Sequence, residues 1–348
     1  MTRTREVIVI GAGPAGVGAA VEAARGGAAV TLISETPPGG RATHASMVPS
    51  KALLHFVSRR RLARESGAPD VAAMMAEIEH QVATRAGLVA RRLEDAGVHV
   101  IRGLARFASP GELLVARDDG REQRLAGDAI IVASGSVPSF PEGFFGAGAS
   151  MPDGEHVMAP RFLRKLRSLP ASILVIGAGV TGAEMVYAWN ALGVEVTWLV
   201  DELGLLPRFD RELASSLGDV LMERGVKIVH GKRVEHVVPQ PGEGVLAKLD
   251  GGRTYAAQRA FVAVGRKPDL ARLELGAAGL SVDARTGALT IDAEARTSVP
   301  HIFAVGDAAG APFTSSKAEL EGWVAGRRAT LREAPPIDRD AMGLWACP

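Results

Sequence analysis

The sequence is poor in cysteine and in aromatic residues. Its 348 residues include one cysteine, Cys347, so the chain as given can form neither an internal disulfide nor a cysteine metal site. Aromatic residues make up 5%, whereas the 41 glycines suit close packing of helices on a sheet. No uninterrupted apolar run reaches about 18 residues, so we expect no transmembrane helix and no membrane partner. The formal charge is only +1, which gives no reason to expect binding to nucleic acid.

Length and the first residues narrow the class further. A chain of 348 residues is too long for one ordinary core, so about two domains are expected. The segment MTRTREVIVIGAG enters a strand directly and leaves no room for a signal peptide. We therefore expect a cytoplasmic protein. We expect no metal-binding residues.

Two glycine-rich turns dominate what is present. Residues 7–16 read VIVIGAGPAG, and residues 173–184 read ILVIGAGVTGAE. Each turn follows an apolar run and precedes an alanine-rich helical stretch, which predicts two β-α-β units. In each turn the first glycine permits the tight bend, the second lets a pyrophosphate approach the backbone, and the third lets helix and strand pack closely. The glycines are Gly11, Gly13 and Gly16 in the first turn, and Gly177, Gly179 and Gly182 in the second. Two such turns predict a protein that brings two dinucleotides together, with the phosphates at helix N-termini.

The rest of the pattern predicts an α/β fold. Strands are expected at residues 6–10, 30–33, 98–101 and 129–132, helices at 16–26, 50–64 and 71–96, and a β-meander over 107–125. A boundary rich in proline, glycine and charge lies near residues 151–161, before the second β-α-β unit. A strand near 302–305 and a helix over about 316–331 follow that unit.

Six sequence segments together resemble the FAD- and pyridine-nucleotide-dependent disulfide oxidoreductases. The segments are VIVIGAGPAG, GGRATHASMVPSKALLH, IIVASGSVP, ILVIGAGVTGAE, AVGRKPDL and IFAVGDAAG, in family order over about residues 5–335. The family includes glutathione reductase, lipoamide dehydrogenase and soluble transhydrogenase, and the stretch around His44 looks most like the transhydrogenase branch. The resemblance implies two Rossmann-like domains, with an NAD domain inserted into an FAD domain. The expected ranges are 1–150 and 273–334 for the FAD domain, 151–272 for the NAD domain and 335–348 for a tail.

The resemblance also assigns site residues. Lys51 and Glu184 resemble an ion pair beside the flavin N5 and are the expected catalytic residues. Asp307 matches the aspartate that binds the FAD ribitol, and Glu35 is expected to hold the adenosine ribose, although Ser34 occupies the aligned position. A carboxylate is the group that suits ribose hydroxyls. The further cofactor-binding residues are Pro14, Ala15, Gly40, Ser134, Gly135, Gly265, Arg266 and Gly306.

One departure from the family bears on the chemistry. The family carries two redox cysteines, spaced C-x4-C, after its Gly-Gly pair, and the alignment places these positions at Ala42 and Met47. Neither side chain can form a thiolate, so reduction of disulfides through a protein dithiol is disfavoured. Electrons are then expected to pass from the flavin to a small-molecule acceptor such as a nicotinamide or a quinone.

The second nucleotide is expected to be NAD rather than NADP. Asp201 and Glu202 follow the strand at residues 194–200, the nearest arginine is Arg208, and two carboxylates would repel a 2′-phosphate. Relatives continue for about a hundred residues as a dimerisation domain. The chain as given stops before such a domain, which leaves its oligomeric state open. A truncated, non-catalytic nucleotide-binding relative with a regulatory or vestigial role is therefore the alternative to an oxidoreductase.

Overall fold

The computed structural model describes residues 3–65, 67–146, 152–240, 242 and 244–339, and these form two compact units. Of the described residues, the first unit holds 3–44, 83–137 and 266–339, and the second holds those within 45–82 and 138–265. The chain leaves the first unit for residues 45–82, leaves it again at β7 (Ser136–Pro138) and returns at β16 (Arg266–Pro268), and β7 and β16 pair with each other. Residues 340–348 of the expected tail at 335–348, and residue 151 of the expected boundary near 151–161, lie outside the described residues.

A seven-stranded sheet organises the first unit, in the order β17-β6-β1-β2-β3-β4-β5. The strands are β1 (Glu6–Ile10), β2 (Ala29–Ser34), β3 (His99–Ser109), β4 (Glu112–Arg117), β5 (Glu122–Ala126), β6 (Ala129–Val132) and β17 (Ile302–Ala304). The first five in that order pair in parallel, and β3 then turns to pair antiparallel with β4. The expected meander is confirmed as β3 to β5, although β3 is a single long strand.

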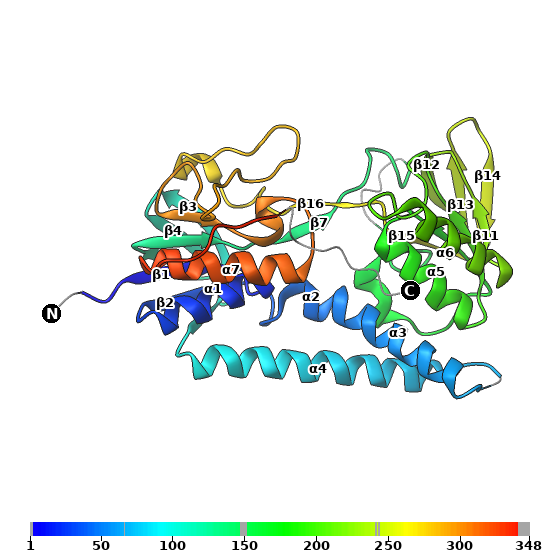
Figure 1. The fold of residues 1–348 in the computed structure, drawn as a ribbon, viewed down its shortest axis with the longest axis horizontal. Coiled ribbons are helices and arrows are strands. Elements are labelled where there is room, and N and C mark those ends of the chain that lie inside the picture. The colour runs from blue at the N-terminus through cyan, green and yellow to red at the C-terminus, as the bar shows by residue number, and fades with distance from the viewer. Residues whose placement is uncertain (1–2, 66, 147–151, 241, 243, 340–348) are drawn as a thin grey trace. The chain divides into compact units, whose positions relative to one another are not determined.

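Both faces of this sheet are buried, which explains its uninterrupted apolar strands. Val7 and Val9 join the core under α1 (Pro14–Arg25) and α7 (Ser315–Ala329), whereas Ile8 and Ile10 join the core on the opposite face. Helices α1 and α7 lie side by side (Figure 1). A Cβ added at Gly322 of α7 would lie 2.1 Å from the carbonyl oxygen of Ala15, so glycine permits this close helix contact.

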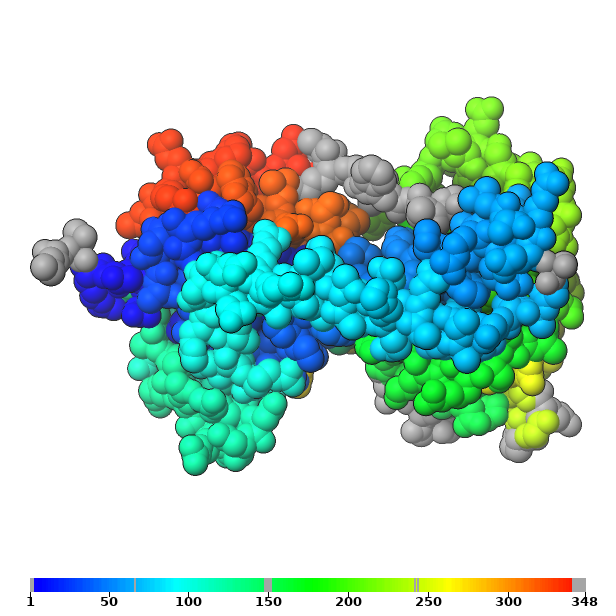
Figure 2. Space-filling view, turned by 90° about the horizontal axis from the view of Figure 1, so that it is seen from below, coloured from blue at the N-terminus to red at the C-terminus, as the bar shows by residue number. Residues whose placement is uncertain are grey.

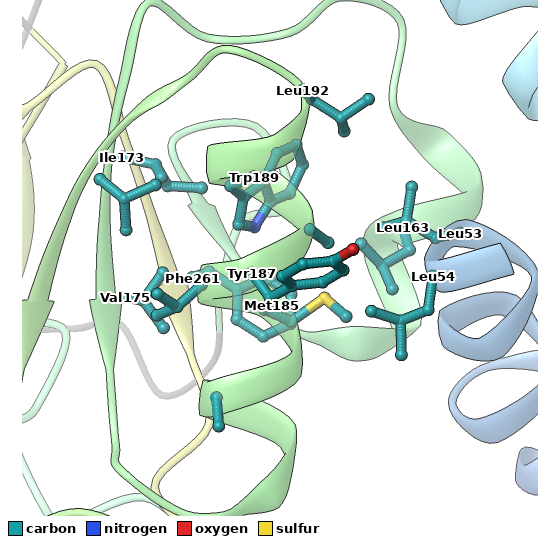
Figure 3. Close-up of a cluster of buried hydrophobic side chains, with 14 of the residues drawn as sticks. Leu53, Leu54, Leu163, Ile173, Val175, Met185, Tyr187, Trp189, Leu192 and Phe261 are labelled. Carbon is teal, nitrogen blue, oxygen red and sulfur yellow. The ribbon is translucent and has the colours of Figure 1, made fainter. Parts of the chain in front are cut away.

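The second unit repeats the theme with a five-stranded parallel sheet, in the order β11-β10-β9-β15-β8. Its strands are β8 (Val157–Met158), β9 (Ser172–Ile176), β10 (Glu195–Leu199), β11 (Lys227–Val229) and β15 (Arg259–Val262). A three-stranded antiparallel sheet of β12 (Val234–Gln240), β13 (Gly244–Leu249) and β14 (Thr254–Ala257) accompanies it. The helices are α3 (Met47–Leu62), α5 (Val180–Ala191) and α6 (Arg211–Glu223), with the short η1 (Pro160–Lys165). Figure 3 shows the aromatic side chains of its main core, where Trp189 and Phe261 are fully buried.

The remaining elements are α2 (Gly40–His44), α4 (Val71–Asp95), η2 (Leu275–Ala278) and η3 (Gly306–Ala309). Helix α4 is exposed along much of its length (Figure 2), and its apolar side chains recur at helical spacing from Met74 to Leu93.

The units do not follow the domain boundaries expected from the sequence. Residues 45–82, which were expected in the first domain, belong to the second unit. The physical reason is packing, because Leu53, Phe56, Met74 and Ile78 are buried in the same core as strand β9. The alignment could not show this, since it places motifs along the chain and not side chains in a core.

Candidate nucleotide-binding sites

The first glycine turn joins β1 to α1 and has no space for side chains at two of its glycines. Gly11 takes φ +105°, and a Cβ there would lie 2.3 Å from the carbonyl oxygen of Ala133. A Cβ at Gly16 would lie 1.8 Å from the carbonyl oxygen of Gly11. Both contacts are with backbone atoms, which cannot move aside without a large energetic cost. The turn therefore requires glycine at these two positions for its own fold.

Gly13 is different, because an added Cβ would meet no atom within 4 Å. It is the N-cap of α1, with ordinary extended backbone angles and no side-chain cap, and Pro14 follows at the start of the helix. The hydroxyl of Ser134, beside Gly11, is buried without a hydrogen-bond partner in the described part of the chain. Open space before uncapped helix amides, together with an unsatisfied hydroxyl, fits a bound phosphate group.

The second turn, between β9 and α5, has nearly the same geometry. Gly177 also takes φ +105°, with a Cβ position 2.4 Å from the carbonyl oxygen of Ala263. A Cβ at Gly182 would lie 2.0 Å from the oxygen of Gly177, and Gly179 again faces open space. The indole N–H of Trp198 donates to the oxygen of Gly177 at 3.0 Å. The residues present therefore fit a second dinucleotide pyrophosphate in the second unit.

Asp307 lies in a hydrogen-bonded chain with two side chains from distant strands. The Ser136 hydroxyl donates to the Asp307 carboxylate, and Arg266 Nε donates to the same hydroxyl oxygen at 2.7 Å. Arg266 also donates to the Ser136 carbonyl at 2.7 Å. Burial, followed by the nearby positive charge of Arg41, lowers the pKa of Arg266. The negative charges of Asp307 and Asp269 act in the opposite direction and raise that pKa. The structure thus brings together two expected residues, Arg266 and Asp307, through a serine that sequence reasoning missed.

The turn that presents Asp307 is held by a second buried network that the sequence did not indicate. The fully buried Lys317 of α7 donates from Nζ to the carbonyl oxygens of Gly306, at 2.8 Å, and Gly310, at 2.5 Å. Glu321, one turn later and also fully buried, accepts from the Gly306 N–H at 2.7 Å and from Arg339 Nε at 2.7 Å. Burial lowers the pKa of Lys317, with Glu321 opposing. The sequence did carry one signal for this network. Lys317 and Glu321 are four residues apart, on the face of α7 that also carries the buried Ala318 and Ala325.

Lys51 and Glu184 form the ion pair expected from the resemblance. The Lys51 ammonium donates to Glu184 Oε1, and both residues belong to the second unit. The Glu184 side chain is 4% exposed, whereas that of Lys51 is 44% exposed. The carboxylate is therefore fixed inside the unit, while the ammonium remains accessible to a ligand.

The end of β2 differs in detail from what was expected. Glu35 is exposed and holds Arg272 through two hydrogen bonds of 2.8 and 2.6 Å. Ser34, at the aligned position, is buried and bonds within its own turn to Thr36. The carboxylate of Glu35 is thus oriented by a partner 237 residues away, and its role toward a ribose stays a prediction.

The remaining expected residues lie in several places. Gly40 packs on the first turn, where its added Cβ would lie 2.8 Å from the Gly13 Cα. Asp201 follows β10 and accepts from the Leu203 N–H at 3.1 Å, which caps its own turn. His44, in the stretch that resembles the transhydrogenase branch, bonds through Nε2 to the Pro38 carbonyl at 3.0 Å. Ala15 faces α7, Gly135 follows β6 and Gly265 follows β15.

Comparison with known proteins identifies the family. Residues 5–328 match the family described as pyridine nucleotide-disulphide oxidoreductase. The chain belongs to this family. It is 34% identical over 345 residues to a dihydrolipoyl dehydrogenase of Thermus scotoductus, a match that covers 95% of this chain and 72% of the relative. It is 31% identical over 334 residues to a soluble pyridine nucleotide transhydrogenase of Colwellia psychrerythraea, covering 92% and 69% respectively.

Solved structures agree with the family. The structure of LpdA from Mycobacterium tuberculosis superposes with a TM-score of 0.89 at 30% identity, covering 96% of this chain and 74% of that one. The HOCl-induced flavoprotein disulfide reductase RclA from Escherichia coli gives a TM-score of 0.82 at 26% identity, covering 95% and 72%. The two Rossmann-like domains are therefore confirmed. The family members bind FAD and NAD(P), which confirms the expected cofactor classes.

Among residues 3–339, apart from the short gaps given above, no three His, Cys, Asp or Glu side chains gather as a metal site would need. None of the helices described there is long and apolar enough to cross a membrane.

Proposed function

We propose that this chain is an FAD-dependent NADH oxidoreductase that passes electrons to a small-molecule acceptor without a protein dithiol. Family membership supports the flavin and nucleotide chemistry. Electron transfer without a protein dithiol is proposed because Ala42 and Met47 stand at the positions of the family's redox cysteines. The only cysteine of the 348-residue sequence, Cys347, lies outside the described residues. A single thiol can supply neither a dithiol nor an internal disulfide.

The residues divide between binding and orientation. FAD, when bound, supplies a ring that takes two electrons from a nicotinamide and returns them to an acceptor. The first glycine turn would hold its pyrophosphate through α1 amides and the free Ser134 hydroxyl. Asp307, fixed by Ser136 and Arg266, would accept hydrogen bonds from ribitol hydroxyls. Lys51 would place a positive charge that favours an anionic reduced ring, with Glu184 restricting its orientation.

The preference for NADH over NADPH rests on the end of β10. The buried Val200 leads to Asp201 and Glu202, whose carboxylates disfavour a 2′-phosphate. The structure adds a competing feature, because the Gly231 N–H donates to the Val200 carbonyl at 3.0 Å. This bond brings the backbone of the basic segment 230–233, which reads HGKR, beside the same strand end. The carboxylates follow Val200 directly, so we expect them to decide the preference.

Anaerobic reduction of the purified flavoprotein tests the proposal. NADH should bleach the flavin directly, faster than NADPH does, and without the long-wavelength absorbance that a thiolate beside oxidised flavin produces. Reoxidation should then occur with a quinone or with a second nicotinamide, but not with glutathione disulfide or lipoamide. Charge-reversed Asp201→Lys should shift the preference toward NADPH, with Glu195→Lys at the exposed start of β10 as the matched control.

Three results would contradict the proposal. A colourless protein that takes up no FAD would leave nucleotide binding without turnover as the function. Rapid reduction of a disulfide substrate would refute the absence of dithiol chemistry. Faster reduction by NADPH in the unmodified protein would show that residues 230–233, and not Asp201, decide nucleotide choice.

A further inference from the structure

A groove of about 840 Å³ lies in the second unit, away from the glycine turn of that unit. It is lined by the C-terminal ends of α3 and α5, by the loop after α3, and by Arg224 at the end of α6. Gly179 is the N-cap of α5, and Tyr187, the first residue of that helix to line the groove, lies eight residues later, so about 12 Å of helix separate the turn from the groove. The volume falls in the range of small-molecule sites.

Positive charge dominates the lining of this groove. Four arginines face it together with one carboxylate, Glu65. Arg60 is occupied, because it donates to Glu65 at 2.9 Å and to the Gly67 carbonyl at 3.2 Å, and these bonds shape one wall. The side chains of Arg61 and Arg64 are exposed and make no hydrogen bond or ion pair with any residue that the structure describes.

The fourth arginine, Arg224, makes a cation–π contact with an aromatic ring. The Arg224 guanidinium lies 5.8 Å from the ring centroid of Tyr187, and Asn190 of α5 donates to the Arg224 carbonyl at 3.1 Å. Figure 3 shows Tyr187 and Leu192 on α5, and both residues line the groove. The partly buried Leu169 adds a second apolar side chain, besides Leu192, to the lining of the groove. The groove therefore combines three guanidinium groups that lack a carboxylate partner with an apolar and aromatic wall.

Helix dipoles do not account for all of this charge. Basic residues at a helix C-terminus interact favourably with the helix macrodipole by about 0.3–1 kcal/mol, and the last turn of α3 carries Arg59, Arg60 and Arg61. Arg59 and Arg60 also pair with carboxylates, Glu77 and Glu65. Arg61, in that turn, and Arg64, beyond the end of the helix, have no carboxylate partner among the described residues. An anionic ligand that neutralises them would explain the arrangement.

We propose that this groove binds a small organic polyphosphate of nucleotide size. Guanidinium groups match phosphate oxygens in a bidentate geometry, and three cations call for more than one phosphate. The Leu169, Tyr187 and Leu192 wall would contact the organic part, as apolar linings do in small-molecule sites. This site is separate from the two glycine turns and does not depend on the redox function.

Isothermal titration of the protein, saturated with FAD and NAD⁺, against ADP and against inorganic pyrophosphate tests the proposal. We expect one saturable site, with ADP binding more tightly than pyrophosphate because the wall contacts its organic part. The double variant Arg61→Gln/Arg64→Gln should weaken binding at least tenfold, and Arg224→Gln alone should weaken it measurably. The matched control, Arg85→Gln/Arg91→Gln on exposed α4, should bind as the unmodified protein does.

The comparison between variants isolates the groove even if ADP also enters a glycine turn, because the turns are intact in all of them. Absence of saturable binding, or equal affinity in the groove variant and the control, would overturn the proposal. Equal affinity for ADP and pyrophosphate would refute the organic part of the assignment. Circular dichroism of each variant verifies that the fold is retained.

Discussion

Replacing Lys317 with methionine should destabilise the first unit strongly. The substitution keeps the length of the side chain but removes the ammonium that bonds to the Gly306 and Gly310 carbonyls and faces Glu321. Both side chains of the pair are fully buried. Removing one partner of a buried ion pair costs about 3–5 kcal/mol, because the other charge is left uncompensated. We expect the lower end, since Arg339 and the Gly306 N–H still satisfy the carboxylate.

Urea unfolding followed by circular dichroism and by flavin release measures this loss. The double variant Lys317→Met/Glu321→Met should lose less than the sum of the two single variants, because it leaves no isolated charge. Flavin should also dissociate more readily from Lys317→Met, because the turn that presents Asp307 loses its support. A loss of less than about 1 kcal/mol, or additive effects in the double variant, would refute the reasoning.

The same network predicts a pH dependence with a definite sign. Burial lowers the pKa of Lys317 from its ordinary 10.5, so between the lowered value and 10.5 the unfolded chain binds more protons than the folded protein. The free energy of unfolding should therefore gain a rising contribution as pH increases through that window. The rise should be absent from Lys317→Met. An identical pH profile in both proteins would contradict the assignment.

Three further predictions follow from the sites. Gly13→Ala should keep the free energy of unfolding but bind FAD at least tenfold more weakly, because the added Cβ meets no protein atom and would enter the space for the phosphate. Gly16→Ala should destabilise the fold itself, because its Cβ would meet the Gly11 backbone. Urea unfolding and flavin titration separate the two effects. Glu184→Gln should retain FAD, lose about 1–2 kcal/mol of stability and slow flavin reduction about tenfold in stopped flow, since Lys51 loses its charged partner. Hydrogen bonding from Arg164 lowers the pKa of Glu79, so this pair contributes stability above pH 4.5 that is lost as pH falls through the folded pKa. Glu79→Gln should lower the free energy of unfolding by under about 1 kcal/mol at neutral pH, and acid titration of both proteins measures this difference.

Local sequence was enough to predict the turns and the buried strands. Gly11 and Gly177 both take φ +105°, and each lies against a backbone carbonyl of the neighbouring parallel strand end. The close contacts of Gly16 with Gly11 and of Gly182 with Gly177 do act within one β-α-β unit, so the spacing of a few residues reveals them. The alternation of Val7 and Ile8 between two buried faces is equally local, because side chains alternate along a strand.

The partners of charged side chains could not be predicted in this way. Arg272 reaches Glu35 across 237 residues, and Arg266 reaches Ser136 across 130. Such pairs depend on how β16 and β7 come together, which no short spacing encodes. Lys51 and Glu184 were found only because a family resemblance supplied both ends of the pair. Lys317 and Glu321 lacked such help, since a Lys and a Glu four residues apart usually form an exposed helix pair.

The two turns also bear on where nucleotide choice resides. Their glycines share similar backbone angles and close contacts, and both helix N-caps face open space, so we expect these glycines alone not to distinguish FAD from NAD. The difference lies at the end of the following strand. After β2 the carboxylate of Glu35 is held outward by Arg272, whereas after β10 Asp201 caps its own turn beside the backbone of a basic segment. We therefore expect side chains outside the glycine motif to set selectivity, and substitutions there should change which nucleotide binds without changing the fold of either turn.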